Sequence, residues 1–253
     1  MTNLLWQSLL TFQLLSASDA QTRFFEAISR DDLTAVRALL KEDPSLARAK
    51  TARGSSALIV AAYIMTSAEY FAPPAKNEVL QEVMRIAPPA DVYEACLVGD
   101  LVRAKSFLDK DPALIKSDTR GWTLLHAAAY SGNVELVKLL LSRGAPVDAI
   151  AGTKYRNTPL QTSMLTGQGA AARALVEAGA DVKHPQWEGF TVLHDAARQG
   201  DLELVRFFVR HGADVNARTI RGDTPIGEAR SHGHPEIATA LEALAAGPSK
   251  KSK

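Results

Sequence analysis

The residues able to carry chemistry are scattered along this chain in groupings that do not suit catalysis. His126 and His194 each end a Thr-x-Leu-His segment, and His232 and His234 flank a single glycine. A zinc site needs three or four histidine, cysteine or carboxylate ligands at close spacing, and neither arrangement supplies them. We therefore expect no metal site, no cofactor and no catalytic histidine.

The other candidate groups lead to the same expectation. Cys96 is the only cysteine, so no intramolecular disulfide can form, and its small-residue surroundings predict a buried, inert thiol. Gly167-Gln168-Gly169 lacks the preceding strand that a phosphate-binding loop requires. One enzymatic alternative stays open, in which Glu69 or Tyr70 contributes chemistry from a stretch at residues 64–76.

The charge balance narrows the class of partner. Lys and Arg total 29 against 28 Asp and Glu, which gives a net charge of +1, and the only basic cluster is Lys250, Lys251 and Lys253 at the end. A surface that neutralises several nucleic-acid phosphates needs a visible basic surplus. We expect no nucleic acid, no membrane and no small-molecule substrate as partner, and a monomeric protein.

Glycines recur at an almost constant interval and reveal how the chain is organised. The spacings along the series Gly99, Gly132, Gly167, Gly200 and Gly233 are 33, 35, 33 and 33 residues. A period of this length is typical of a stacked array rather than of one shared core. A segment of about 33 residues is too small to fold alone, so each unit must pack against its neighbours to be stable.

The repeated segments, at residues 121–149, 157–183, 189–217 and 222–247, resemble the ankyrin repeat. Its Thr-Pro-Leu-His pattern appears in pieces at Thr123 to His126, Thr158 to Gln161, Thr191 to His194 and Thr224 to Gly227. The resemblance implies an all-α fold, an α-solenoid of about six helix-turn-helix repeats joined by β-hairpin-like turns. It also implies that His126 and His194 hydrogen-bond to a neighbouring turn.

Each copy carries its own start and stop signals. Thr123 and its counterparts are predicted helix N-caps, with proline following at Pro159 and Pro225. Leu136, Val137, Leu140 and Leu141 form an apolar stripe for a second helix. In the less regular N-terminal half, Asp91 with Glu94 fits a capping box and predicts a helix start there. Residues 64–76 form an insertion, read either as a specificity loop or as a solvated loop with its aromatics packed.

These signals divide the chain into three regions. We expect an apolar segment at 1–18, a single solenoid at 19–247 and a flexible basic tail at 248–253. The approximate repeats are 19–50, 51–90, 91–118, 119–153, 154–186 and 187–247, the last including a C-terminal cap. The 1–18 segment, with Leu4 and Leu15 bounding its apolar run, reads as an extra helix or as a signal peptide. A cytoplasmic location is expected, with export as the alternative.

What remains for function is recognition of another protein. The resemblance implies that partners contact the turn tips and the exposed side of the first helices. Trp, Tyr and Arg dominate interface energetics, which favours such residues in those places. We expect a non-catalytic scaffold, adaptor or regulator, with an exported or host-directed binder as the alternative. The candidate binding residues are Arg120, Trp122, Tyr130, Tyr155, Arg156, Trp187, Phe190, Arg198, Ile220 and Arg221.

Overall fold

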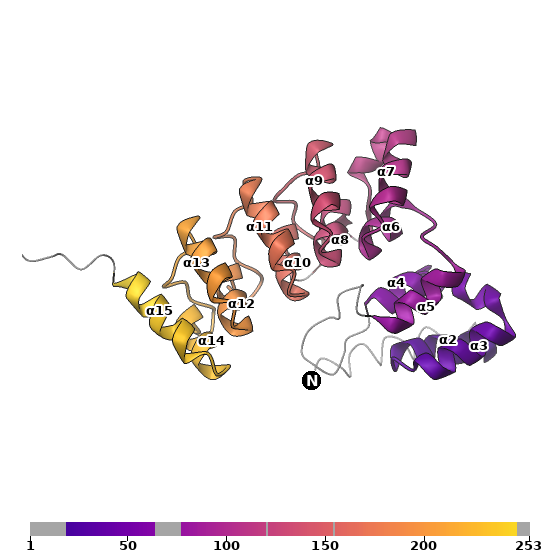
Figure 1. The fold of residues 1–253 in the computed structure, drawn as a ribbon, viewed down its shortest axis with the longest axis horizontal. Coiled ribbons are helices and arrows are strands. Elements are labelled where there is room, and N and C mark those ends of the chain that lie inside the picture. Colours follow the sequence, from indigo (N-terminus) through magenta and orange to yellow (C-terminus); the bar gives the residue numbers. More distant parts are fainter. Residues whose placement is uncertain (1–18, 64–76, 120, 154, 247–253) are drawn as a thin grey trace, which may run out of the picture. The chain divides into compact units, whose positions relative to one another are not determined.

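The computed structural model describes residues 19–63, 77–119, 121–153 and 155–246. These residues contain fourteen α-helices, arranged as consecutive helical pairs, and one two-stranded hairpin (Figure 1). The protein is therefore all-α, as the repeat pattern predicts. The chain divides into two compact units, residues 1–114 and 115–253. The expected specificity loop at 64–76, with Glu69 and Tyr70, and the segment at 1–18 lie outside the described residues.

Unit 1 consists of three helical pairs. They are α2 (Asp19–Ser29) with α3 (Leu33–Glu42), α4 (Ala57–Ala62) with α5 (Glu78–Ile86), and α6 (Val92–Val98) with α7 (Leu101–Lys110). A 3₁₀ helix η1 (Pro44–Arg48) follows α3, and η3 (Pro112–Lys116) follows α7. First helices pack on first helices along the unit, α2 on α4 and α4 on α6. Asp91 caps α6 as predicted, accepting the Glu94 N–H at 2.8 Å, while the Glu94 carboxylate accepts the N–H of Ala90.

Unit 2 begins with the hairpin of β1 (Asp118–Thr119) and β2 (Trp122–Thr123) and continues as four helical pairs. The first helices are α8 (Leu124–Ser131), α10 (Pro159–Leu165), α12 (Val192–Gln199) and α14 (Pro225–Ser231). The second helices are α9 (Val134–Ser142), α11 (Gly169–Glu177), α13 (Leu202–Arg210) and α15 (Pro235–Ala245). Residues 187–247, taken as one terminal repeat from the sequence, thus contain two helical pairs.

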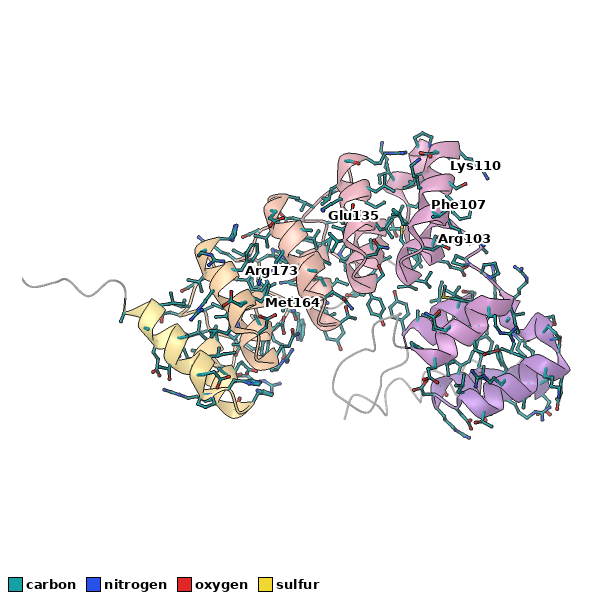
Figure 2. The ribbon with its side chains drawn as sticks, in the orientation of Figure 1. Arg103, Phe107, Lys110, Glu135, Met164 and Arg173 are labelled. Atoms are coloured by element: carbon teal, nitrogen blue, oxygen red, sulfur yellow. The ribbon has the colours of Figure 1, made fainter. Side chains whose placement is uncertain are left out.

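The helices of unit 2 start and stop where the sequence predicts. Thr123, Thr158, Thr191 and Thr224 are the N-caps of the four first helices. Gly132 ends α8 and Gly200 ends α12 in left-handed conformation. The apolar stripes of the second helices face inward. Arg173 of α11, labelled in Figure 2, extends toward α13, where its guanidinium carbon lies 4.7 Å from the centre of the Phe207 ring. Small buried residues such as Ala128 and Ala196 let adjacent first helices approach closely.

The turns before the first helices are joined to one another by backbone hydrogen bonds. The Gly152 N–H donates to the carbonyl of Gly121 at 3.1 Å, and Trp187 donates in the same way to Tyr155 at 3.3 Å. The Ile220 N–H donates to the carbonyl of Glu188 at 2.9 Å. Because successive turns are joined by backbone hydrogen bonds, unit 2 holds its turns in a fixed register.

A pair of glycine variants tests this close approach. Gly121 and Gly222 occupy the same turn position with φ of 78° and 87°. A Cβ on Gly121 would lie 2.4 Å from the backbone nitrogen of Gly152, whereas one on Gly222 would meet nothing within 4 Å. We expect Gly222→Ala to cost about 1 kcal/mol through the left-handed backbone alone and Gly121→Ala about 2 kcal/mol or more. Urea denaturation of both variants measures the difference, and equal losses would contradict the close approach.

Candidate protein-interaction surface

Large apolar side chains are exposed on successive turn tips of unit 2. Tyr155 is 47% exposed, Trp187 61% and Ile220 73%, and each stands on a different turn. Large contiguous apolar patches on soluble proteins commonly mark contact sites, whereas single exposed apolar side chains need no explanation. Three exposed ones on turns that are hydrogen-bonded to one another form a candidate contact surface.

Two arginines complete this surface. Arg156 follows Tyr155 and is exposed, and Arg221 follows Ile220 with its guanidinium 3.5 Å from the Glu188 carboxylate of the preceding turn. That ion pair is largely exposed, so it contributes little to stability. We call Tyr155, Arg156, Trp187, Ile220 and Arg221 the tip surface. Of the expected binding residues, Arg120 lies outside the described residues.

Tyr130 does not lie on an exposed face, and the sequence expectation for it is wrong. Its side chain is fully buried. The ring lies 6.2 Å from the Trp122 ring, centre to centre, and its carbonyl accepts the Thr166 hydroxyl at 3.0 Å. A large aromatic ring at the end of α8 gains more by packing inside the repeat than by facing water. Tyr130 therefore has no surface to offer a partner.

Trp122 and Phe190 are half-buried, each beside a histidine of its own repeat. The Trp122 and His126 ring centres are 5.8 Å apart, and those of Phe190 and His194 are 5.4 Å apart in an edge-on arrangement. Aromatic pairs at these distances stabilise packing. These two aromatics cover their histidines, which leaves only part of each ring accessible.

Arg198 forms an ion pair with the buried carboxylate of Asp195. Its guanidinium lies 2.7 Å from the carboxylate of Asp195, one turn earlier in α12, and Gln186 donates to the same carboxylate at 3.4 Å. Burial raises the pKa of Asp195 to about 6, against the opposing effect of Arg198, and Glu228 raises it further. Arg198 is half-buried, and its guanidinium is engaged with Asp195.

The two motif histidines tie neighbouring repeats together, as the resemblance implies. The Nε2 atom of His126 lies 3.0 Å from the carbonyl oxygen of Asn157, and that of His194 lies 3.3 Å from the carbonyl oxygen of Asp223. Burial lowers the pKa of His126 to about 4 and lowers that of His194. Both imidazoles are neutral at pH 7 and serve as structural hydrogen-bond groups.

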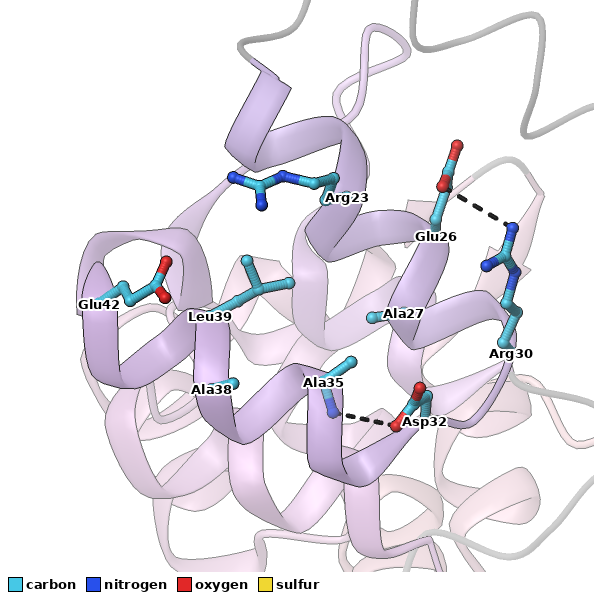
Figure 3. A pocket seen from close by; sticks show the side chains of 9 residues that line it. All are labelled: Arg23, Glu26, Ala27, Arg30, Asp32, Ala35, Ala38, Leu39 and Glu42. Carbon is cyan, nitrogen blue, oxygen red and sulfur yellow. Dashed lines mark hydrogen bonds and ion pairs between the residues drawn. The ribbon is translucent and has the colours of Figure 1, made fainter.

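A groove between α2 and α3 gathers several charged side chains (Figure 3). Ala27, Ala35 and Leu39 line it, with the charged residues around them. Most of its charged side chains have partners: Glu26 pairs with Arg30 at 3.8 Å, Arg23 pairs with Asp19 at 3.4 Å, and Asp32 accepts the Ala35 N–H as the cap of α3. No acid and base converge on a common point in this groove.

The remaining reactive groups are buried or dispersed. Cys96 is fully buried and burial raises the pKa of its thiol to about 12, which confirms the expected inert thiol. Among the described residues no three His, Cys, Asp or Glu side chains are close enough to hold a metal ion. Within those same ranges no helix is long and apolar enough to cross a bilayer.

Comparison with protein families decides the classification. A model of three ankyrin-repeat copies matches residues 92–186, and a second ankyrin-repeat model matches residues 175–229. Together they span more than half of the chain. The chain is an ankyrin-repeat protein. Ankyrin repeats bind other proteins, so this array implies a protein-protein interaction module.

Related proteins contain similar arrays in different contexts. The chain is 32% identical over 151 residues to a transient receptor potential cation channel subfamily A member 1 homolog of Caenorhabditis elegans, covering 59% of this chain and 12% of that protein. It is 39% identical over 111 residues to the B-cell lymphoma 3 protein homolog of Mus musculus, covering 44% of this chain and 25% of the other.

A bacterial relative is matched over a larger share of its length. The chain is 29% identical over 141 residues to a putative ankyrin repeat-containing protein of Treponema pallidum, covering 56% of this chain and 47% of that protein. The chain thus spans half or less of each of these three relatives. Their similarity to it concerns the repeats.

Proposed function

We propose that this ankyrin-repeat protein is a non-catalytic interaction module that captures a partner protein on the tip surface. The observation that carries the proposal is the exposure of Tyr155, Trp187 and Ile220 on successive, hydrogen-bonded turns. A rigid backbone presenting large side chains loses little entropy when a partner binds. The dispersed and partnered polar groups described above support binding rather than turnover.

The test is a triple variant, Tyr155→Ala, Trp187→Ala and Ile220→Ala. Immobilised wild type and variant are exposed to extract of the native cell, and captured proteins are quantified by mass spectrometry. We expect one partner to be retained by the wild type and lost from the triple variant, since aromatic anchors carry most interface energy. The partner is then purified and its dissociation constant measured directly against both proteins.

A matched control removes exposed apolar side chains elsewhere. Val102 on α7 is 78% exposed and Leu244 on α15 is 42% exposed, so Val102→Ala with Leu244→Ala removes exposed apolar side chains away from the turn tips. This control should capture the partner as the wild type does. Equal capture by the triple variant, with its helical circular dichroism intact, would reject the tip surface.

A further inference from the structure

One turn of this protein has arginine where the others have glycine. In four turns, the residue two positions before the helix N-cap donates its N–H to the carbonyl of the residue three positions earlier. The N···O distances are 2.8 Å for Gly54, 3.1 Å for Arg156, 2.9 Å for Gly189 and 2.9 Å for Gly222. All four have a left-handed backbone, with φ of 80°, 52°, 85° and 87° respectively. Gly121, with φ 78°, has the same place in its turn. Arg156 is the exception among the five.

A left-handed backbone is unfavourable for any residue with a Cβ and costs glycine nothing. Asn and Asp tolerate it because their short side chains hydrogen-bond locally, but arginine has no such compensation. Glycine at position 156 would fit the turn better than the residue present. Strained residues of this kind concentrate at functional sites, so the guanidinium must supply something that the backbone does not need.

The surroundings of Arg156 indicate what the guanidinium meets. It is exposed beside Tyr155, on the surface that also carries Trp187, Ile220 and Arg221. Lys183, Arg218 and the acids Asp181 and Asp214 are exposed on the same series of turns, and Glu188 lies 3.5 Å from Arg221. Among the residues that directly follow the apolar tips, Arg221 pairs with Glu188, and Arg156 places a positive charge beside Tyr155. A complementary partner carries negative charge beside large apolar side chains.

We propose that Arg156 is a specificity-determining residue that pairs with an Asp or Glu carboxylate of the partner, within a segment where this acid adjoins large apolar residues. The inference rests on the tip surface being the binding surface. Arginine suits the task because its planar fork donates two parallel hydrogen bonds to one carboxylate. A net charge of +1 favours an acidic protein segment over a nucleic acid, which would require many phosphate contacts.

Two substitutions separate the strain from the recognition. Arg156→Gly relieves the left-handed backbone and removes the guanidinium, so it should raise the thermal midpoint by about 2–4 °C. Arg156→Ala removes the guanidinium and keeps the strain, so it should leave the midpoint unchanged. Both should weaken binding of an acidic segment by about tenfold, the effect of losing one charge-assisted contact.

Asp31→Gly is the matched control. Asp31 has φ 54° in the turn between α2 and α3. Gly99 has the corresponding position in the turn between α6 and α7, with φ 77°. The variant relieves a left-handed non-glycine residue in unit 1, away from the turn tips in sequence. Because Asp tolerates a left-handed backbone better than Arg, the thermal midpoint should rise less than in Arg156→Gly, and binding should stay unchanged.

The probe is a displayed library of random peptides, selected on the full chain. We expect enriched peptides to contain Asp or Glu within a few residues of Trp, Phe, Leu or Ile. Dissociation constants of synthesised peptides are then measured for the wild type, the two Arg156 variants, Asp31→Gly and the tip triple variant. Tenfold weaker binding to both Arg156 variants, with Asp31→Gly at the wild-type value, supports the proposal.

The alternative outcomes are distinct. Enriched peptides without acids, or acidic peptides that bind the Arg156 variants as tightly as the wild type, overturn the role of Arg156. If those peptides still require Tyr155, Trp187 and Ile220, the proposed function survives that result. Peptides that ignore both Arg156 and the apolar tips overturn both proposals.

Discussion

Replacing Tyr130 with alanine is expected to destabilise unit 2 by about 3–5 kcal/mol, the usual cost of removing a large aromatic side chain from a packed interior. The Tyr130 side chain has no exposed surface, and its ring contacts that of Trp122. Truncation leaves a cavity and takes away one side of the packing around Trp122. Urea denaturation followed by circular dichroism gives the change in the free energy of unfolding.

Tyr155→Ala provides the matched control, because it removes the same side chain from a position that is 47% exposed. We expect it to cost less than about 1 kcal/mol, as surface substitutions ordinarily do. The two substitutions should thus have different effects: Tyr130→Ala should lower stability, and Tyr155→Ala should reduce capture of the partner. Equal stability losses from the two substitutions would contradict the burial described for Tyr130.

The register of the repeats was readable from the sequence because it depends on local signals. Threonine caps, prolines at the first helical position and glycines at helix ends act within a few residues, and the structure confirms the helix starts at Thr158 and Thr224. The histidine hydrogen bonds followed from the same resemblance. These features repeat, so several copies reinforce each prediction.

Burial at one register position was not readable, because it depends on the individual side chain. Tyr130 and Arg198 occupy the same place at the ends of α8 and α12. The tyrosine ring folds onto Trp122, whereas the arginine remains half-buried and pairs with Asp195. An alignment of repeats gives the position of a residue along a helix but does not show which side chains it packs against.

The tip surface could likewise be predicted only in part from the sequence. The turns and their exposed residue types were predicted, but hydrogen bonds such as that between Trp187 and Tyr155 join residues of different repeats. The left-handed backbone of Arg156 has no signal in its own residue type. It becomes apparent only when the turn is compared with the three that carry Gly121, Gly189 and Gly222.

Acid is expected to destabilise unit 2 through its motif histidines. The Nδ1 atom of His126 accepts the Thr123 N–H at 3.2 Å, so Nε2 carries the proton that is donated to Asn157, and the buried ring is neutral. Its pKa is about 4 in the folded protein, against 6.5 for a histidine exposed to water in the unfolded chain. Between these values the unfolded chain binds the proton and the folded chain does not. Stability is fully present above pH 6.5 and falls by about 3 kcal/mol as the pH drops to 4.

Gln161 shows which substitution removes this dependence without breaking the hydrogen bonds. At the corresponding position of the α10 repeat its Oε1 accepts the Thr158 N–H at 2.9 Å and its Nε2 donates to the carbonyl of His184 at 2.7 Å. The variant His126→Gln with His194→Gln should therefore fold, with the same links between repeats and no titrating group at either position.

The two proteins should be compared by urea denaturation at several values between pH 4 and 7. Asp195 acts in the opposite direction in this range, because its raised pKa means that its contribution is lost as the pH rises from 3.8 to about 6. The carboxyl is present in both proteins, so subtracting their stability profiles cancels it and isolates the histidines. From pH 6.5 to pH 4, the free energy of unfolding of the wild type should fall by about 3 kcal/mol or more relative to that of the double glutamine variant. A difference independent of pH would mean that His126 and His194 are already exposed to water, and that the hydrogen bonds joining the repeats are not buried.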